Sequence, residues 1–363
     1  MIRRSSRRSL VVAAALAAVL GAAGCGTAEP AGALPAAGPP TPVLGSQPTA
    51  GLTEAGEPPQ VGITAAPQGV PAVGWAAMTT LVDIRAAGDR PLPEPLEAPS
   101  CSLAGCSWSF GTETLVWSAS TGARALRTEV FSRWKSSGGN LGWPVTSEYS
   151  FGGDYRTDFQ KGTLMYVPRL GRTMAYLPEV EKAAVVIGDS QAGRDTWVGK
   201  GLFSLGYHPV ILGAGGTGYT QGNGRVGNYP SALEGEEWLM PWGKPGLVVL
   251  QGGGNDAHGP SNQAIRQNAL QLIREIRRTY PETRIVVVGV IGDGGGRRGE
   301  VDDLMARVSA EEDLEFLSPK DWWKRYSLGS KLDDGLHFGR GGHDAAAPVF
   351  ARELRKILDR PQD

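Results

Sequence analysis

Four short motifs in the sequence carry side chains that could perform nucleophilic catalysis. The first contains Ser190 and directly follows the apolar run 183–188. The last is Asp334-Gly-Leu-His337, in which the carboxylate could hold one imidazole nitrogen while the other accepts the proton of Ser190. A serine at a strand-to-helix turn can also be a simple helix cap, so Ser190 by itself is ambiguous.

The two motifs between them could stabilise a developing negative charge. The glycine-rich segment 213–224 contains Gly218, and Asn255 lies in the segment 251–256. The backbone N–H groups of Ser190 and Gly218 and the side-chain amide of Asn255 could hold an oxyanion. The glycines also match a dinucleotide-binding spacing, but that loop should follow the first strand and precede an acidic residue at a strand end. We therefore reject the dinucleotide alternative.

A metal site is the other chemistry that these residues could support. Asp334, His337 and His343 could bind a metal ion, but the sequence offers no further ligand cluster beside them. We therefore expect neither a metal nor an organic cofactor.

The elements that must position these motifs are short apolar runs alternating with helical segments. The runs are 183–188, 209–212, 246–250, 284–291 and 314–317. The stretch 261–280 is predicted to be a helix with Ser261 as its N-cap, and a closing helix is expected after Gly341. This pattern indicates one α/β domain over 181–363, with a parallel sheet covered on both faces and the motifs at its carboxyl edge.

Taken together and in this order, the four motifs resemble the SGNH hydrolases, also called the GDSL family. The resemblance covers about residues 183–358 and assigns the nucleophile, two oxyanion groups and the acid–base pair to Ser190, Gly218, Asn255, Asp334 and His337. It implies a three-layer, flavodoxin-like fold with a parallel five-stranded sheet, and ester chemistry without a metal. Gln191 replaces the leucine of the GDSL motif, and Gly213 stands where many members have asparagine.

The expected function is that of an extracytoplasmic serine esterase acting on an ester of the cell envelope. Two alternatives stay open. The same residues could transfer the acyl group to a wall sugar instead of water, or the protein could be a wall-binding lipoprotein that has lost its activity.

The amino-terminal residues predict export. Residues 1–24 combine a basic start with the uncharged apolar run 10–23 and are expected to be a signal peptide. Cys25 follows directly, and the residues around it are similar to a bacterial lipobox, which implies a diacylated cysteine and a membrane anchor. A plain secretory signal is the alternative. Residues 25–72 are rich in Pro, Ala and Gly and predict a disordered tether.

The net charge of the chain is −1, with no basic run beyond residue 8, so no nucleic-acid partner is expected.

Residues 73–178 contain five of the ten tryptophans and an internal repeat, because 110–117 is echoed by 159–166. Around the Leu-Gly-Trp-Pro sequence 141–144, this stretch resembles the LGFP repeat of cell-wall proteins. The resemblance implies that the module binds wall polysaccharide. We expect it to be separable from the hydrolase, so that its deletion leaves activity on a small soluble ester nearly unchanged; the alternative is a module packed against the hydrolase as structural support.

Cys101 and Cys106 lie five residues apart in this module. In an oxidising compartment such a pair can persist as a local disulfide, which we predict here, with two free thiols as the alternative.

Overall fold

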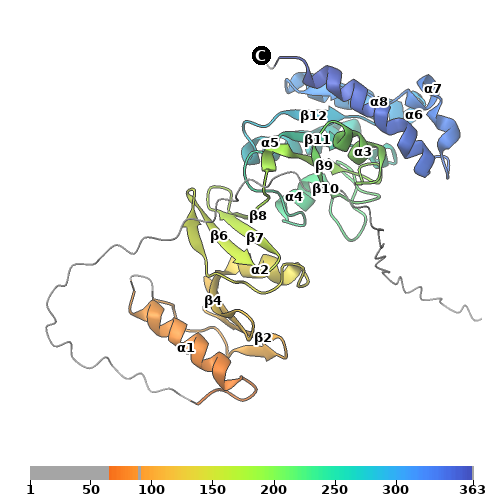
Figure 1. The fold of residues 1–363 in the computed structure, drawn as a ribbon. Coiled ribbons are helices and arrows are strands. Elements are labelled where there is room, and N and C mark those ends of the chain that lie inside the picture. The colour runs from red at the N-terminus through yellow and green to blue at the C-terminus, as the bar shows by residue number, and fades with distance from the viewer. Residues whose placement is uncertain (1–64, 89–90, 362–363) are drawn as a thin grey trace, which may run out of the picture. The chain divides into compact units, whose positions relative to one another are not determined.

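The computed structural model describes residues 65–88 and 91–361 (Figure 1). The predicted signal peptide, Cys25 and nearly all of the tether lie outside these residues.

The first helix, α1 (Ala72–Ala86), packs Trp75 and Met78 into a core that also includes Val70, which is only 9% exposed. The packed part of the chain therefore begins before residue 73, where the sequence analysis placed it. Within the described residues, no helix is both long and apolar enough to cross a bilayer.

The internal repeat forms two antiparallel sheets of four strands, each in sequential order. The first contains β1 (Ser100–Ser102), β2 (Gly105–Ser109), β3 (Glu113–Ser118) and β4 (Gly122–Arg127). The second contains β5 (Tyr149–Phe151), β6 (Asp154–Phe159), β7 (Gly162–Val167) and β8 (Arg172–Ala175). In each copy the repeated sequence leads into the third strand of its four-stranded meander, β3 or β7.

Helix α2 (Thr128–Ser136) joins the two sheets and buries Val130 and Trp134. These side chains share one core cluster with Val116 of β3, Phe159 of β6 and Leu164 of β7. A single small meander has too little apolar surface to bury a face alone, so each repeat stabilises the other through this common core.

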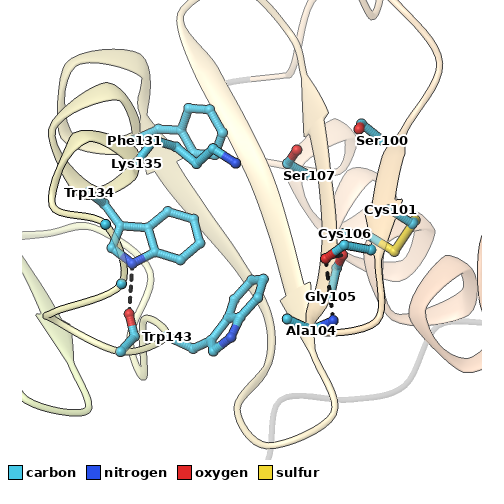
Figure 2. Close-up of a pocket in the computed structure, with 14 residues that line it drawn as sticks. Ser100, Cys101, Ala104, Gly105, Cys106, Ser107, Phe131, Trp134, Lys135 and Trp143 are labelled. Atoms are coloured by element: carbon cyan, nitrogen blue, oxygen red, sulfur yellow. Dashed lines mark hydrogen bonds between the residues drawn. A yellow bond between two sulfur atoms is a disulfide. The ribbon is translucent and has the colours of Figure 1, made fainter. Parts of the chain in front are cut away.

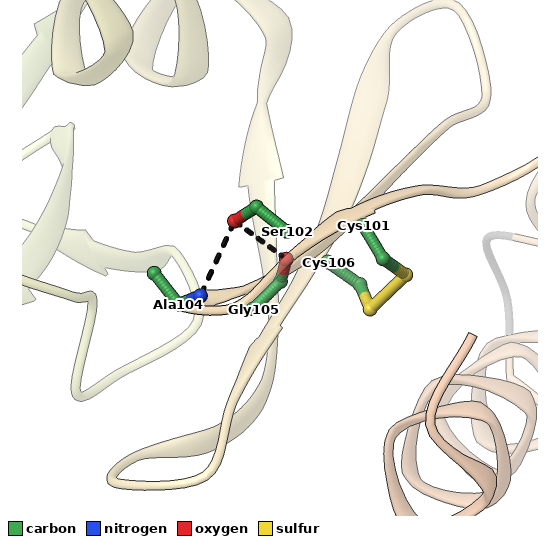
Figure 3. Close-up of a disulfide and its surroundings, with 5 residues drawn as sticks. All are labelled: Cys101, Ser102, Ala104, Gly105 and Cys106. Atoms are coloured by element: carbon green, nitrogen blue, oxygen red, sulfur yellow. Dashed lines mark hydrogen bonds between the residues drawn. A yellow bond between two sulfur atoms is a disulfide. The ribbon is translucent and has the colours of Figure 1, made fainter. Parts of the chain in front are cut away.

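The predicted disulfide between Cys101 and Cys106 is present in the structure (Figure 3). The two cysteines are directly opposite each other in the β1–β2 hairpin. Ser102 Oγ accepts the backbone N–H of Ala104 at 3.3 Å and donates to the carbonyl of Gly105 at 3.4 Å. The covalent bond and these hydrogen bonds fix the hairpin turn.

The domain that the sequence predicted to be a hydrolase contains the expected five-stranded parallel sheet, in the order β10-β9-β11-β12-β13. Its strands are β9 (Ala183–Gly188), β10 (His208–Gly213), β11 (Leu247–Gln251), β12 (Ile285–Val288) and β13 (Glu315–Leu317). Alternate residues of β9 belong to different cores: Val185 and Ile187 to one, Ala184 and Val186 to the other. A strand that is buried on both faces needs no polar alternation, which is why the sheet reads as apolar runs.

Helices cover both faces of this sheet and complete three layers. One face is covered by α3 (Trp197–Ser204), α7 (Trp322–Arg325) and α8 (Arg340–Leu358), and α8 packs against α3 (Figure 1). The other is covered by α4 (Tyr229–Glu234), α5 (Asn262–Thr279) and α6 (Gly296–Glu311). Single 3₁₀ turns lie at η1 (Val180–Lys182), η2 (Asn255–Ala257) and η3 (Leu328–Lys331). The predicted cap is confirmed, because the Ser261 side chain accepts the N–H of Ala264. The structure confirms the predicted three-layer α/β fold with a parallel five-stranded sheet.

The second repeat is continuous with the core of the hydrolase. Val167, Leu170 and Met174 belong to the same core cluster as the buried side chains of α4, α5 and α6. Arg172 pairs with Glu275 of α5 at 3.2 Å, with side chains only 6% and 14% exposed. The module is therefore packed against the hydrolase and is not an independent unit joined by a linker, contrary to our expectation of separability.

Asp302 on α6 gives a testable pH dependence of stability. Its carboxylate accepts the N–H of Val290 at 2.9 Å and the hydroxyl of Ser318 at 2.6 Å, and burial raises its pKa to about 6. In the unfolded chain an aspartate titrates at ~3.9, so the folded protein binds more protons between these values. We expect this residue to lower the free energy of unfolding by about 2–3 kcal/mol as the pH rises from 4 to 6.

Asp302→Asn should flatten this fall, because the amide can keep both hydrogen bonds and cannot ionise. Urea unfolding at pH 4, 5, 6 and 7 measures the effect. The neighbouring Asp303 is exposed and pairs with Lys320, so Asp303→Asn is the matched control, in which the fall in stability between pH 4 and 6 should persist. Equal slopes in wild type and Asp302→Asn between pH 4 and 6 would contradict the assignment.

Candidate active site

Ser190 lies in the turn after β9, at the carboxyl edge of the sheet. Its Oγ is 2.9 Å from Nε2 of His337, which lies 147 residues further along the chain. His337 is placed by the short segment between η3 and α8, where Asp333 N–H donates to the carbonyl of His337 at 2.8 Å. The fold thus brings the first and the last of the four motifs into hydrogen-bond contact.

Asp334 holds the other side of the imidazole. Its Oδ2 is 2.8 Å from Nδ1 of His337, and its Oδ1 accepts the backbone N–H groups of His337 and Leu336 at 2.6 and 2.9 Å. These hydrogen bonds, the backbone one from His337 above all, lower the pKa of Asp334. The carboxylate therefore stays ionised and favours the tautomer that is protonated at Nδ1, which leaves the Nε2 lone pair directed at Ser190.

The triad is open to solvent. The side chains of His337 and Asp334 are 41% and 57% exposed. A reacting group carried on a large molecule can therefore approach these side chains from the surface.

The side chain of Asn255 is hydrogen-bonded to the glycine-rich loop 213–224. Its Nδ2 donates to the carbonyl of Thr217 at 2.9 Å, which leaves its second amide hydrogen for another acceptor. On the same loop, a Cβ built at Gly215 would be 3.7 Å from Cβ of Ser190. The loop therefore lies directly beside the predicted nucleophile.

The backbone N–H of Gly218 has a different partner from the one that the sequence analysis proposed. Its N–H already donates to the carbonyl of Gln221 at 2.8 Å and is not free to bind an oxyanion in this arrangement. The need for glycine here has another cause, because a Cβ at this position would overlap the carboxylate of Asp256. The sequence placed Gly218 in the right loop, but the partner of its amide depends on how that loop closes.

Residues 180–345 match the model of the GDSL-like lipase/acylhydrolase family. This segment is a GDSL/SGNH hydrolase domain. It is the domain of a serine hydrolase that acts on ester bonds. No curated protein sequence matches the chain.

Solved structures with a similar fold include a G-D-S-L family protein from Veillonella parvula, at 14% identity and a TM-score of 0.39, over 49% of this chain and 99% of that one. A family two carbohydrate esterase from Clostridium thermocellum, in complex with cellohexaose, is 17% identical with a TM-score of 0.40, over 52% of this chain and 67% of that one. An acetyl xylan esterase from Butyrivibrio proteoclasticus is 15% identical with a TM-score of 0.37, with the same coverage of 52% and 67%.

Three residues of the GDSL domain that the sequence analysis did not assign to the site hold its loops in place. Asp256 is fully buried and accepts the N–H groups of Tyr219 and Thr220 at 2.9 and 2.7 Å, together with the Thr220 hydroxyl. The sequence analysis gave a role to Asn255 in this segment and none to the residue after it. The missed signal was an acid five positions after the end of β11, in a glycine-rich segment that follows a buried strand.

Gln191, the departure from the family motif, is 4% exposed and connects two parts of the site. Its amide oxygen accepts the indole N–H of Trp197 at 3.2 Å, and its amide nitrogen donates to the carbonyl of Leu336 at 3.4 Å. Asp189, on the other side of Ser190, accepts the N–H of Gln191 at 2.9 Å, and burial raises its pKa to about 6. These contacts hold the nucleophile turn near the histidine loop.

His343 does not join the Asp334–His337 pair. Its Nδ1 accepts the N–H of Trp197 at 3.3 Å, and burial lowers its pKa. Among residues 65–88 and 91–361, no group of three or more His, Cys, Asp or Glu side chains is arranged to hold a metal ion.

Proposed function

We propose that the protein is an extracytoplasmic serine esterase that removes acyl groups from a component of the cell envelope. The observation that carries this proposal is the linked set Ser190, His337 and Asp334, joined at 2.9 and 2.8 Å and open to solvent. An exposed triad suits an ester that projects from a bulky polymer, because such a substrate does not have to enter an enclosed cavity.

In the proposed reaction, Ser190 Oγ bonds to the ester carbonyl carbon as its proton passes to Nε2 of His337. The tetrahedral intermediate then breaks the bond to the alcohol, whose oxygen takes the proton from His337. Water attacks the acyl-serine, again giving a proton to His337, and the acid leaves as that proton returns to Ser190. Asp334 stabilises the imidazolium at both stages.

The oxyanion of each intermediate would accept hydrogen bonds from the Ser190 N–H and the second amide hydrogen of Asn255. The Gly218 N–H can contribute only if it exchanges its bond to Gln221. Asn255 therefore has a larger share of the proposed oxyanion hole than the three-donor prediction gave it.

Asn255→Ala is expected to lower kcat on a small soluble ester by about 10²–10³, the usual effect of losing one oxyanion donor. KM should change little, because the charge develops only in the transition state. Steady-state kinetics at several ester concentrations separates the two constants.

Asn223→Ala provides the matched control, since Asn223 also ties the same loop by donating to the carbonyl of Gly215 at 2.9 Å. If Asn255 serves only as a loop tether, both variants will lower kcat to a similar extent, which would overturn the oxyanion role.

The cellular location is proposed from the sequence. Residues 1–24 would direct export, a lipid on Cys25 would anchor the protein to the membrane, and residues 25–72 would give it reach. The repeat module would bind wall polysaccharide and keep the esterase beside an insoluble substrate. Release of a Cys25→Ala variant from the membrane fraction into the medium would test the anchor.

The substrate is tested with isolated cell walls that carry O-linked acyl groups. The full chain should release free carboxylic acid from them, measured by chromatography, and Ser190→Ala should not. Soluble sugars added as acceptors should leave the yield of free acid unchanged. Acyl-sugar formed in place of the acid would assign the protein to acyl transfer, and no acid or acyl-sugar from walls despite turnover of small esters would overturn the envelope substrate.

A further inference from the structure

The repeat module contains a cavity of about 440 Å³ between the β1–β2 hairpin and helix α2 with the loop that follows it (Figure 2). This volume lies in the range of small-molecule sites, roughly 300–1,000 Å³. The cavity belongs to the module, and no residue of the proposed triad lines it.

One wall is the disulfide-bonded hairpin, which contributes the hydroxyl groups of Ser100 and Ser107. The hairpin lies close against the ring of Trp143 on the other wall. A Cβ at Gly105 would be 2.6 Å from that ring, so only glycine lets the backbone approach so closely. The disulfide and this glycine together give the wall a fixed shape without a ligand.

The two tryptophans of the opposite wall have different roles. Trp134 is 8% exposed, and its indole N–H donates to the carbonyl of Gly142 at 2.7 Å, so it supports the loop. Trp143 is half-buried, and its indole N–H has no hydrogen-bond partner among the described residues. Trp143 thus offers the cavity a free donor as well as a ring.

The only charge among the described residues that line the cavity is positive. Lys135 on α2 is exposed, with Nζ 6.0 Å from the centre of the Phe131 ring, and it is the one charged residue among the 14 described residues of the lining. No carboxylate of the lining neutralises it. A ligand that carries a negative charge near this ammonium would gain a charge-assisted hydrogen bond.

We propose that this cavity is the saccharide site of the module and that it binds an acidic oligosaccharide of the wall. Aromatic rings can pack against the apolar C–H face of a sugar, the indole N–H and serine hydroxyls can bond to its hydroxyl groups, and Lys135 can pair with its carboxylate. The proposal rests on the proposed function, because it names the site through which the module would hold wall polysaccharide.

The test measures co-sedimentation of the full chain with isolated cell walls, before and after the wall carboxylates are blocked by amidation. Trp143→Phe removes the N–H and keeps an aromatic ring, and Lys135→Glu reverses the charge. Lys161→Glu, an exposed site at the β6–β7 turn outside the lining, is the matched control. Thermal melting of each variant checks the fold.

We expect Lys135→Glu to weaken binding at least tenfold and Trp143→Phe about three- to tenfold, in line with the loss of one hydrogen bond. Lys161→Glu should bind as wild type does, and amidated walls should bind wild type weakly. If wild type binds walls but Trp143→Phe and Lys135→Glu bind equally well, the cavity is not the site, and the proposed function survives. If wild type retains full binding to amidated walls, the acidic ligand is wrong. If wild type does not bind walls at all, the proposed role of the module fails as well.

Discussion

Ser190→Ala is expected to reduce turnover of a small soluble ester by about 10⁴–10⁶-fold, the range seen when the nucleophile of a serine hydrolase is removed. The substitution removes the hydroxyl that lies 2.9 Å from Nε2 of His337, so the imidazole loses the group whose proton it would accept. The fold should remain intact, since the only hydrogen bond of the Ser190 side chain among the described residues is the one to His337.

Covalent labelling checks this independently of turnover. A fluorescent phosphonate ester should label the wild-type protein and leave Ser190→Ala unlabelled, while both melt at similar temperatures. Ser330→Ala is the matched control: Ser330 is an exposed serine in η3, and its hydroxyl donates to the carbonyl of Ser327 at 3.1 Å. Retained labelling or retained turnover in Ser190→Ala would refute the assignment of the nucleophile.

Deletion of residues 73–178 is expected to abolish activity on soluble esters by unfolding the hydrolase domain. It removes Val167, Leu170 and Met174 from the main core cluster, together with Arg172, one of the two arginine partners of Glu275. Each such side chain contributes about 1.5–3 kcal/mol when buried, so the loss is roughly 5–9 kcal/mol. A typical domain is stable by only 5–15 kcal/mol.

Circular dichroism measures whether the deletion variant folds, and ester turnover measures its activity. A milder variant, Leu170→Ala, should lower the free energy of unfolding by about 2–5 kcal/mol with kcat unchanged below the melting transition. Leu103 is fully exposed at the β1–β2 hairpin, so Leu103→Ala should leave stability unchanged. A deletion variant that folds and keeps full soluble-ester activity would show that the two parts are separable after all.

The elements that the sequence predicted well are those whose pattern is local. The three inner strands of the hydrolase sheet, β9, β11 and β12, are short apolar runs because both of their faces are buried, and each run is visible without knowledge of its neighbours. The helix after Ser261 has a capping side chain and a clear apolar face. The cysteine pair was predictable because its members lie only five positions apart, in a single hairpin.

The bounds of α1 and α6 were not predicted, because their sequences lack such a pattern. In α1, Val73 and Ile84 are exposed while Trp75 and Met78 are buried, so apolar residues lie on all sides and mark no single face. In α6, the chain starts with Gly-Arg-Arg-Gly without a capping side chain, and the inward face carries the buried acid Asp302. Only the packing of these helices against their sheets defines which face is inside.

The sequence by itself determined which chemical groups the protein has and that Ser190, Gly218 and Asn255 follow the ends of three strands. It determined neither the partners of those groups nor the connection between the module and the hydrolase. The contact of Ser190 with His337, the bond of Gly218 to Gln221, and the packing of Leu170 in the hydrolase core were decided by the tertiary structure. Propensity and periodicity act over a few residues, whereas these contacts depend on how distant segments pack and how a glycine-rich loop closes over Asp256.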